Sequence, residues 1–283
     1  MKTFPFFFAG FALAFVSCQH NKSQTTTNQA SVTSQYFDSM PIASLIPASV
    51  AKYQQIIESG HDINQLNDEG TTYLVQAIQD NLIPAVKALI QSGADVNGST
   101  TSGISPLMAV IENGNKSIPK VLNNGATVQV ELNKSVNEHL INQLIEAGAD
   151  VNFCNQHLQT ALMVAGSLGN IDATQLLIEH NADLEKQDFN GMTALAFAAA
   201  NNHIEVVKKL LHAGANPNCT DVQGQTPLIY AAEKGNLEIA KLLVQEKADV
   251  NMRDAYDVSP LQTAKLNAHE ELAKFLKKNN AKD

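Results

Sequence analysis

The 283-residue chain contains three cysteines, eight histidines and 28 acidic residues, side chains that could support nucleophilic, metal-dependent or acid–base chemistry. Cys18, Cys154 and Cys219 are an odd set without a close pair, so they form neither a disulfide framework nor a zinc site. The histidines have no ligand spacing, and His203 and His269 occupy equivalent turn positions of a repeated segment, where polar residues are common. No glycine-rich phosphate loop, serine elbow or plausible Cys/His pair is present. We therefore expect no catalytic site, no metal and no cofactor.

The acidic residues recur inside a short motif. Strings that resemble Gly-Ala-Asp-Val-Asn begin at positions 60, 93, 148, 181, 214 and 247, and most of these starts are spaced by 33. A Thr/Ser-x-Leu motif begins in phase with them at positions 72, 105, 160, 193, 226 and 259. The repeated Asp is expected to stabilise a turn rather than to act as an acid or base. Two motifs with one period predict a tandem repeat.

One unit predicts a pair of helices. Thr193 can cap a helix over Ala194–Ala200, and a polar turn follows at Asn201–His203. The next segment, 204–211, has an apolar stripe at helical spacing, and Gly214 is suited to end that helix in a left-handed conformation. One such pair cannot cover its own apolar face, so neighbouring units must stack.

These motifs resemble the ankyrin repeat over residues 38–283. The resemblance implies an all-α solenoid of about eight helix-pair units with β-hairpin fingers, two degenerate caps and one shortened unit. Ala51–Ser59 is expected to be a helix of the first cap, and His269–Lys278 the helix of the last. All six units lack the histidine that follows Thr-Pro-Leu in this family, so we expect them to depend more on apolar packing.

The register breaks once. Gly148 follows the Gly125-Ala-Thr-Val-Gln129 string at a spacing of 23, and Thr160 follows Ser105 at a spacing of 55. We interpret this segment as a shortened unit at 127–152 that lacks about ten residues. It would consist of a stub helix at Val130–Val136 and a normal second helix at Glu138–Ala147. Such a unit is either a decayed repeat or a local bend in the stack.

Residues 1–37 predict that the chain is directed to a membrane. Phe4–Val16 is apolar but too short to span a bilayer, so residues 1–17 are expected to be a signal peptide. Ser17-Cys18 resembles the end of a bacterial lipobox, which implies lipidation of Cys18, although Phe15 departs from the usual leucine. Residues 18–37 are polar and predict a disordered tether that precedes a domain at 38–283. An ordinary signal with a chance cysteine is the alternative.

The net charge and the expected localisation limit the classes of molecule that could be partners. The net charge of −9, without a cluster of Lys and Arg, argues against nucleic acid. In lipoproteins of Gram-negative bacteria, Gln19 after the cysteine favours the outer membrane, facing the periplasm. We expect a monomer that is held in the bacterial envelope by Cys18. Secretion as an effector that binds a host protein is the alternative, and an envelope enzyme on a repeat scaffold is a third.

Repeat stacks bind partners on finger tips and first helices, where positions vary between units. We expect a non-catalytic protein-binding module whose partner docks on the fingers of the C-terminal half. The predicted contact residues are Phe189, Asn190, Met192, Val222, Gln223, Gln225, Ala255 and Tyr256. The alternative is that Phe189 packs on its own hairpin and Tyr256 on the terminal repeat. Cys154 and Cys219 lie in finger segments two repeats apart, so both are expected to be free thiols.

Overall fold

The computed structural model describes residues 48–114, 117–121, 127–131 and 134–282. The chain divides into two compact units, Met1–Pro41 and Ile42–Asp283, and all of the described residues belong to the second. The predicted signal peptide, the tether and Cys18 therefore lie outside the described residues.

The described elements are α2 (Ala48–Glu58), α3 (Tyr73–Gln79), α4 (Ile83–Gln91), α5 (Pro106–Asn113), β1 (Ser117–Val121), β2 (Thr127–Glu131), α6 (Lys134–Glu146), α7 (Ala161–Leu168), α8 (Ile171–Glu179), α9 (Ala194–Ala200), α10 (Ile204–His212), α11 (Pro227–Lys234), α12 (Leu237–Gln245), α13 (Pro260–Leu266) and α14 (Glu270–Lys278).

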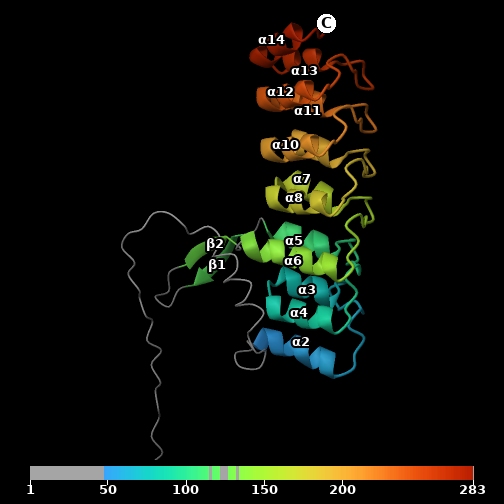
Figure 1. The fold of residues 1–283 in the computed structure, drawn as a ribbon, viewed down its shortest axis with the longest axis vertical. Coiled ribbons are helices and arrows are strands. Elements are labelled where there is room, and N and C mark those ends of the chain that lie inside the picture. The colour runs from blue at the N-terminus through green and yellow to red at the C-terminus, as the bar shows by residue number, and fades with distance from the viewer. Residues whose placement is uncertain (1–47, 115–116, 122–126, 132–133, 283) are drawn as a thin grey trace, which may run out of the picture. The chain divides into compact units, whose positions relative to one another are not determined.

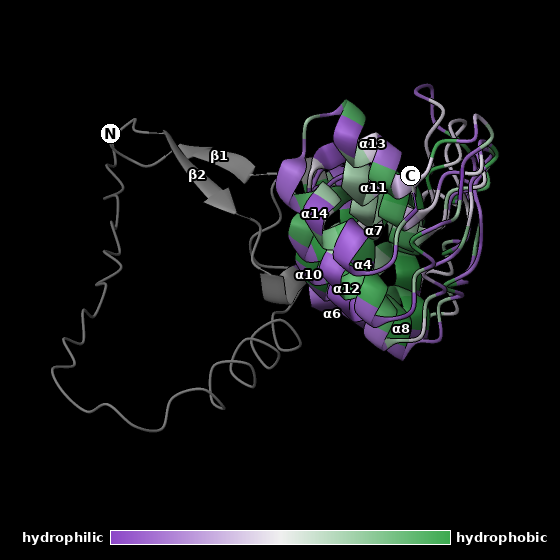
Figure 2. Ribbon diagram, turned by 90° about the horizontal axis from the view of Figure 1, so that it is seen from above, coloured by the Kyte–Doolittle hydropathy of each residue, from purple (hydrophilic) through white to green (hydrophobic). Residues whose placement is uncertain are grey.

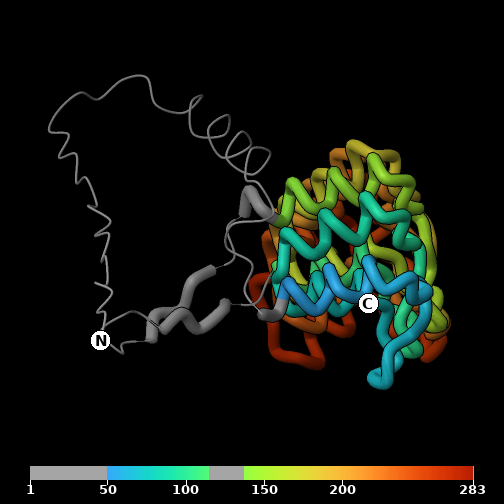
Figure 3. Tube along the Cα trace, turned by 90° about the horizontal axis from the view of Figure 1, so that it is seen from below, coloured from blue at the N-terminus to red at the C-terminus, as the bar shows by residue number. Residues whose placement is uncertain are grey.

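The helices form two layers. The inner layer is α3, α5, α7, α9, α11 and α13, in which each helix packs on the next. The outer layer is α2, α4, α6, α8, α10, α12 and α14. The pairs rise in chain order from α2 to α14, and the connecting loops lie along one side of the helices (Figure 1). The same stacking is visible from below, where successive pairs overlap (Figure 3). The described helices thus make six inner–outer pairs and α2, which is fewer than the eight units predicted.

Each inner helix begins directly after the Thr or Ser of the repeated Thr/Ser-x-Leu motif, of which Thr193 was predicted to be a cap. In all six, the Ser or Thr side chain accepts a hydrogen bond from the backbone N–H three residues on; the caps are Thr72, Ser105, Thr160, Thr193, Thr226 and Ser259. This bond satisfies one of the free donors of a helix N-terminus. The caps are themselves buried, so they fix where one unit meets the next.

The core repeats with the same period. Each unit has a fully buried leucine in its outer helix, four residues before the position that Gly214 occupies in its own unit. These leucines are Leu89, Leu144, Leu177, Leu210, Leu243 and Leu276. Helix faces alternate between hydrophobic and hydrophilic residues (Figure 2). A continuous apolar core therefore runs between the layers, as the predicted stacking requires.

Each regular pair turns on a residue with a left-handed backbone. The residue nine positions after the cap has positive φ at Asn81, Gly169, Asn202, Gly235 and Ala268. At Gly169 and Gly235, an added Cβ would lie 2.4 and 2.5 Å from the Nδ1 atoms of His203 and His269. These two histidines, predicted as ordinary turn residues, make 3.0 Å hydrogen bonds to carbonyl oxygens of the preceding inner helix, Ser167 and Glu233.

The finger segments are tight turns. An Asn or Asp side-chain oxygen accepts two backbone N–H groups in most of them, as Asp221 does from Gln223 and Gln225 at 2.9 and 2.8 Å. Outside β1 and β2, the described residues contain one isolated β-bridge, Leu66 to Thr72. β-Hairpin fingers therefore stay a prediction.

The prediction of a shortened unit is wrong. Gly114 occupies the turn position after α5, but its φ is −59°, so the chain does not reverse there. It continues into β1 and β2, and then into α6, which packs against α5. Helices α5 and α6 thus form one complete pair with an insertion between them. Of the stub helix predicted at Val130–Val136, residues 130–131 lie in strand β2 and residues 134–136 belong to α6, which starts at Lys134 rather than Glu138.

A ladder of hydrogen bonds joins neighbouring units, and the sequence separation of the bonded residues gives the length of the insertion. The side-chain oxygen that ends each Gly-Ala-Asp-Val-Asn motif accepts the backbone N–H of a residue in the next unit, at 2.7–2.8 Å. The bonded residues are 31 apart in sequence at every step except Asn97 to Asp150, where they are 53 apart. This surplus of 22 equals the excess of the Ser105–Thr160 spacing over the regular period. One unit has therefore gained a segment of that length.

The ladder also identifies side chains that link neighbouring units. Without the family histidine, we expected more dependence on apolar packing. Five asparagines and Glu185 also tie each unit to its neighbour, and Asn97, Asn218 and Asn251 donate from their Nδ2 atoms to a carbonyl of the next unit as well. The motif aspartates accept the N–H two residues on, as Asp150 does from Asn152, which confirms their role in turns.

Candidate functional site

The finger tips of the C-terminal half are joined by backbone hydrogen bonds. Phe189 donates to the His157 carbonyl, Val222 to that of Asn190, and Ala255 to that of Gln223, at 2.7–3.1 Å. These bonds space the tips evenly, one per unit. The tips therefore form a continuous ridge, which we call the finger ridge (residues 156–158, 189–190, 222–223 and 255–256).

Large apolar side chains on the finger ridge are exposed to solvent. Phe189 is 61% exposed, Val222 70% and Tyr256 74%. Exposure this high excludes full packing of Phe189 on its own turn or of Tyr256 on the terminal repeat. The Phe189 ring instead meets the His157 ring edge-on, with centroids 6.3 Å apart. Consecutive tips thus hold each other while their outer faces stay open.

Leu158 is a ridge residue that the sequence interpretation missed. Four other fingers have glycine at this position, and all four adopt positive φ: Gly70, Gly103, Gly191 and Gly224. Leu158 has a φ of 59° and is 42% exposed. A left-handed conformation is unfavourable for a residue with a Cβ and is worth examining for function. The sequence signal was a bulky residue in a column of glycines.

The predicted contact residues divide into two groups. Six of them lie exposed or half-exposed on the finger ridge: Phe189, Asn190, Val222, Gln223, Ala255 and Tyr256. Met192 and Gln225 are half-buried at the base of the fingers, where their N–H groups bind the Asp188 and Asp221 carboxylates. These two residues close their turns and are poorly placed for contact at the tip.

A second apolar row lies on the inner helices. Val164, Phe197 and Tyr230 occupy the same position of α7, α9 and α11 and are half-buried. The Tyr230 hydroxyl donates to the Asp221 carboxylate at 2.6 Å, and burial together with that bond raises the pKa of the phenol. Val164 and Phe197 line a hollow of about 500 Å³, which also includes Glu112, Gln159, Met163, Ser167 and Leu168. This row was not predicted, because its members look like core residues in the sequence.

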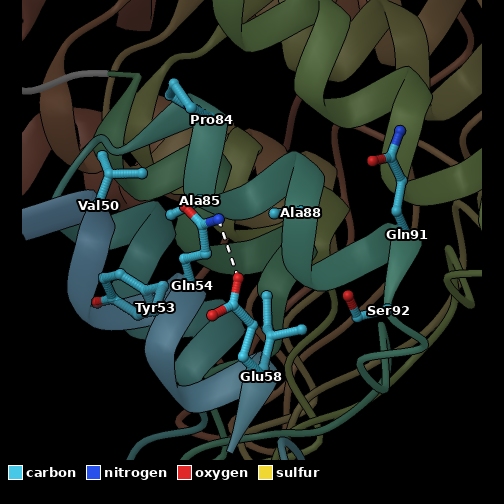
Figure 4. Close-up of a pocket in the computed structure, with 10 residues that line it drawn as sticks. Val50, Tyr53, Gln54, Glu58, Pro84, Ala85, Ala88, Gln91 and Ser92 are labelled. Carbon is cyan, nitrogen blue, oxygen red and sulfur yellow. Dashed lines mark hydrogen bonds between the residues drawn. The ribbon is translucent and has the colours of Figure 1, made fainter. Parts of the chain in front are cut away.

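A smaller hollow of about 220 Å³ lies between α2 and α4 (Figure 4). Val50, Tyr53 and Ala85 are its buried lining residues, and Pro84 and Gln91 also border it. Gln54 donates to the Glu58 carboxylate at 3.1 Å across the α2 side. The hollow holds no constellation of acid, base and nucleophile.

The thiols and charged groups of the described residues do not converge. Cys154 is half-buried, with Lys186 Nζ 3.7 Å from its sulfur. Cys219 is buried beside the Thr193 hydroxyl at 3.2 Å, and burial raises the pKa of its thiol to about 11. Both thiols are free. Within the described ranges, no group of three or more His, Cys, Asp or Glu is arranged to hold a metal ion, and none of the helices has the length and hydropathy of a membrane span.

Comparison with known proteins covers most of the stack. A family model described as "Ankyrin repeats (3 copies)" matches residues 47–132, 130–221 and 209–283. The mouse (Mus musculus) "B-cell lymphoma 3 protein homolog" is 32% identical over 123 residues, which are 39% of this chain and 28% of that protein. The human (Homo sapiens) "Neurogenic locus notch homolog protein 2" is 28% identical over 125 residues, 40% of this chain and 5% of that protein. The chain thus matches less than a third of either relative.

Proposed function

Because the chain belongs to the ankyrin-repeat family, we propose that it is a non-catalytic protein-binding module that docks its partner on the finger ridge. The observation that supports this most is the exposure of Phe189, Val222 and Tyr256 on tips tied in a row. A turn is ordinarily polar, and a row of apolar side chains on successive turns stays in water unless a partner covers it.

The inner-helix row extends the docking surface. Val164, Phe197 and Tyr230 lie one unit apart on the face next to the fingers, and the adjacent hollow is large enough to receive an apolar side chain. Aromatic residues carry much of the binding energy at interfaces. The partner is therefore expected to contact both rows, with aromatic anchors at Phe189 and Tyr256.

The strain at Leu158 supports the same surface. A glycine would relieve the left-handed conformation at this tip, as it does in four other fingers. A leucine in this conformation suits a residue that is used for contact rather than for folding. Leu158 adds a fourth apolar side chain at the α7 end of the finger ridge.

The test is a double variant, Phe189→Ser with Tyr256→Ser, in the full chain. Partner capture should fall by about 30-fold or more, which corresponds to a hot-spot loss of about 2 kcal/mol. The melting temperature should barely move, because most exposed surface substitutions change stability by less than about 0.5 kcal/mol. Ile171→Ser, at an exposed residue of the outer layer, is the matched control and should leave capture unchanged. A fall in stability with intact binding per folded molecule would place the site elsewhere.

We also propose that a lipid on Cys18 displays the module from a bacterial envelope membrane, facing the periplasm. The support is the apolar run that ends at Ser17-Cys18 and the polar segment after it. Cys18→Ala should abolish palmitate labelling and release the chain from the membrane fraction. Release of the unaltered chain into the medium or a host would favour the secreted alternative instead.

A further inference from the structure

The insertion between α5 and α6 contains a β-hairpin that the repeat fold does not need. Strands β1 and β2 pair antiparallel, from Ser117 opposite Glu131 to Val121 opposite Thr127. Among the described residues this sheet has two strands. A two-stranded hairpin is marginal in water and gains stability from a third strand or a packing surface. The hairpin is thus suited to receive another strand.

The two edges of the hairpin differ in their capacity to pair. β1 contains Pro119, which lacks an N–H donor, and Lys120, a residue that protects sheet edges. β2 has the sequence Thr-Val-Gln-Val-Glu, without proline or lysine and with three β-branched residues. The sequence of β2 is therefore better suited than that of β1 to pair with another strand.

The sequence of β2 is complementary to itself. If two copies of β2 run antiparallel with Gln129 opposite Gln129, then Val128 falls opposite Val130 of the second copy, and Thr127 falls opposite Glu131. Pairs of β-branched residues are favourable across strands, and no like charges oppose each other in this register. We propose that two copies of the chain associate through β2 into a four-stranded sheet, in the order β1-β2-β2-β1. This self-association replaces the monomer expected from the sequence and does not depend on the finger ridge.

The proposed interface has a defined character. Five residues per strand bury little surface, so the dimer is expected to be weak and concentration-dependent. Each copy carries a net charge of −9, and their mutual repulsion is screened by salt. Added salt should therefore strengthen the dimer. Two copies would present two finger ridges, which increases the apparent affinity for any partner with two sites.

Charge exchange at Gln129 tests the register. In sedimentation velocity over a concentration series, Gln129→Lys and Gln129→Glu should each weaken self-association about two- to fivefold, because like charges then meet at the symmetry axis. An equal mixture of the two variants should associate at least as well as the unaltered chain. Gln245→Glu, which makes the same change of net charge as Gln129→Glu at an exposed residue of α12, is the matched control and should weaken association less than Gln129→Glu does. A mixture that associates no better than either variant alone would refute this register.

Removal of the insertion tests whether the hairpin is required at all. Deletion of Lys116–Asn137 removes the whole surplus and joins Gly114-Asn115 to Glu138, which recreates the Gly-Asn turn found at Gly169-Asn170 and Gly235-Asn236. This variant should sediment as a monomer at every concentration, with the helical circular dichroism of the stack intact. An unaltered chain that stays monomeric throughout the series and at raised salt, or a deletion variant that still dimerises, would overturn the proposal. Either result leaves the finger-ridge experiment unaffected.

Discussion

The α5–α6 unit and the α9–α10 unit are built into the stack in the same way and differ in the turn between their helices. Both have a buried hydroxyl cap, Ser105 or Thr193, and a buried outer leucine, Leu144 or Leu210. The regular unit reverses at Asn202 with a φ of 66°, whereas Gly114 is right-handed and the whole segment 114–133 separates α5 from α6. The finger end of a unit is thus constrained by its neighbours, and the opposite end is free to vary.

The largest expected effect tests whether the two units are equally part of the core. Leu144→Ala and Leu210→Ala should each lower the free energy of unfolding by about 2–5 kcal/mol, because each removes a fully buried side chain and leaves a cavity. Urea unfolding followed by circular dichroism gives both values. A cost below about 1 kcal/mol for Leu144→Ala alone would show that α6 is not integrated into the stack.

A second pair of variants compares two strained residues. Leu158→Gly and Ala268→Gly should each raise the free energy of unfolding by up to about 1 kcal/mol, because both residues have positive φ at a position where some of the other units have glycine. Leu158→Gly should also weaken partner capture, while Ala268→Gly, away from the finger ridge, should not. Equal capture by both variants would remove Leu158 from the binding surface.

The Lys116–Asn137 deletion should change the free energy of unfolding by less than about 1 kcal/mol. Loop-closure entropy depends weakly on length, and the variant keeps residues 138–146 of α6 with the buried Leu144. Thermal melts of the deletion variant and the unaltered chain measure this difference. A large loss would mean that the hairpin supports the stack and that the two units are not equivalent.

The smallest expected effect distinguishes the two thiols. The Cys219 thiol has its pKa raised to about 11, from an ordinary 9.0, by burial. Its favourable contribution to stability is full below pH 9 and is lost as the pH rises toward 11, because the unfolded chain ionises first. Iodoacetamide at pH 8 should therefore modify the half-buried Cys154 well before Cys219, as peptide mass spectrometry would show. Equal rates would indicate that the fingers around Cys219 open readily.

The repeated part of the fold could be predicted from the sequence because the structure of each unit depends on residues within that unit. The caps, the helix pair at Ala194–Ala200 and 204–212, and the last helix all follow from residue spacing within one unit. Terminal helices were placed within three residues of their observed starts. Periodicity then required the units to stack, and the family comparison agrees.

The insertion was misjudged because Gly125-Ala-Thr-Val-Gln129 imitates the Gly-Ala-Asp-Val-Asn motif. That likeness favoured a unit that had lost residues over a unit that had gained them. The insertion is shown by the hydrogen bond between Asn97 and Asp150, which are 53 residues apart in sequence. Patterns of neighbouring residues do not reveal a contact at that separation. The exposure of Phe189 and Tyr256 likewise depends on neighbouring units, so the ridge could be proposed from sequence but its open face could not.

The ladder of side-chain bonds also determines how the molecule would respond to force. Each rung joins only adjacent units, so a pull along the stack loads the rungs in series and releases one unit at a time. A regular unit yields roughly 110 Å of extended chain at about 3.4 Å per residue. The α5–α6 unit stores the insertion as well, so its release gives one longer step of roughly 190 Å. In an optical trap, that single long step marks the position of the insertion along the stack.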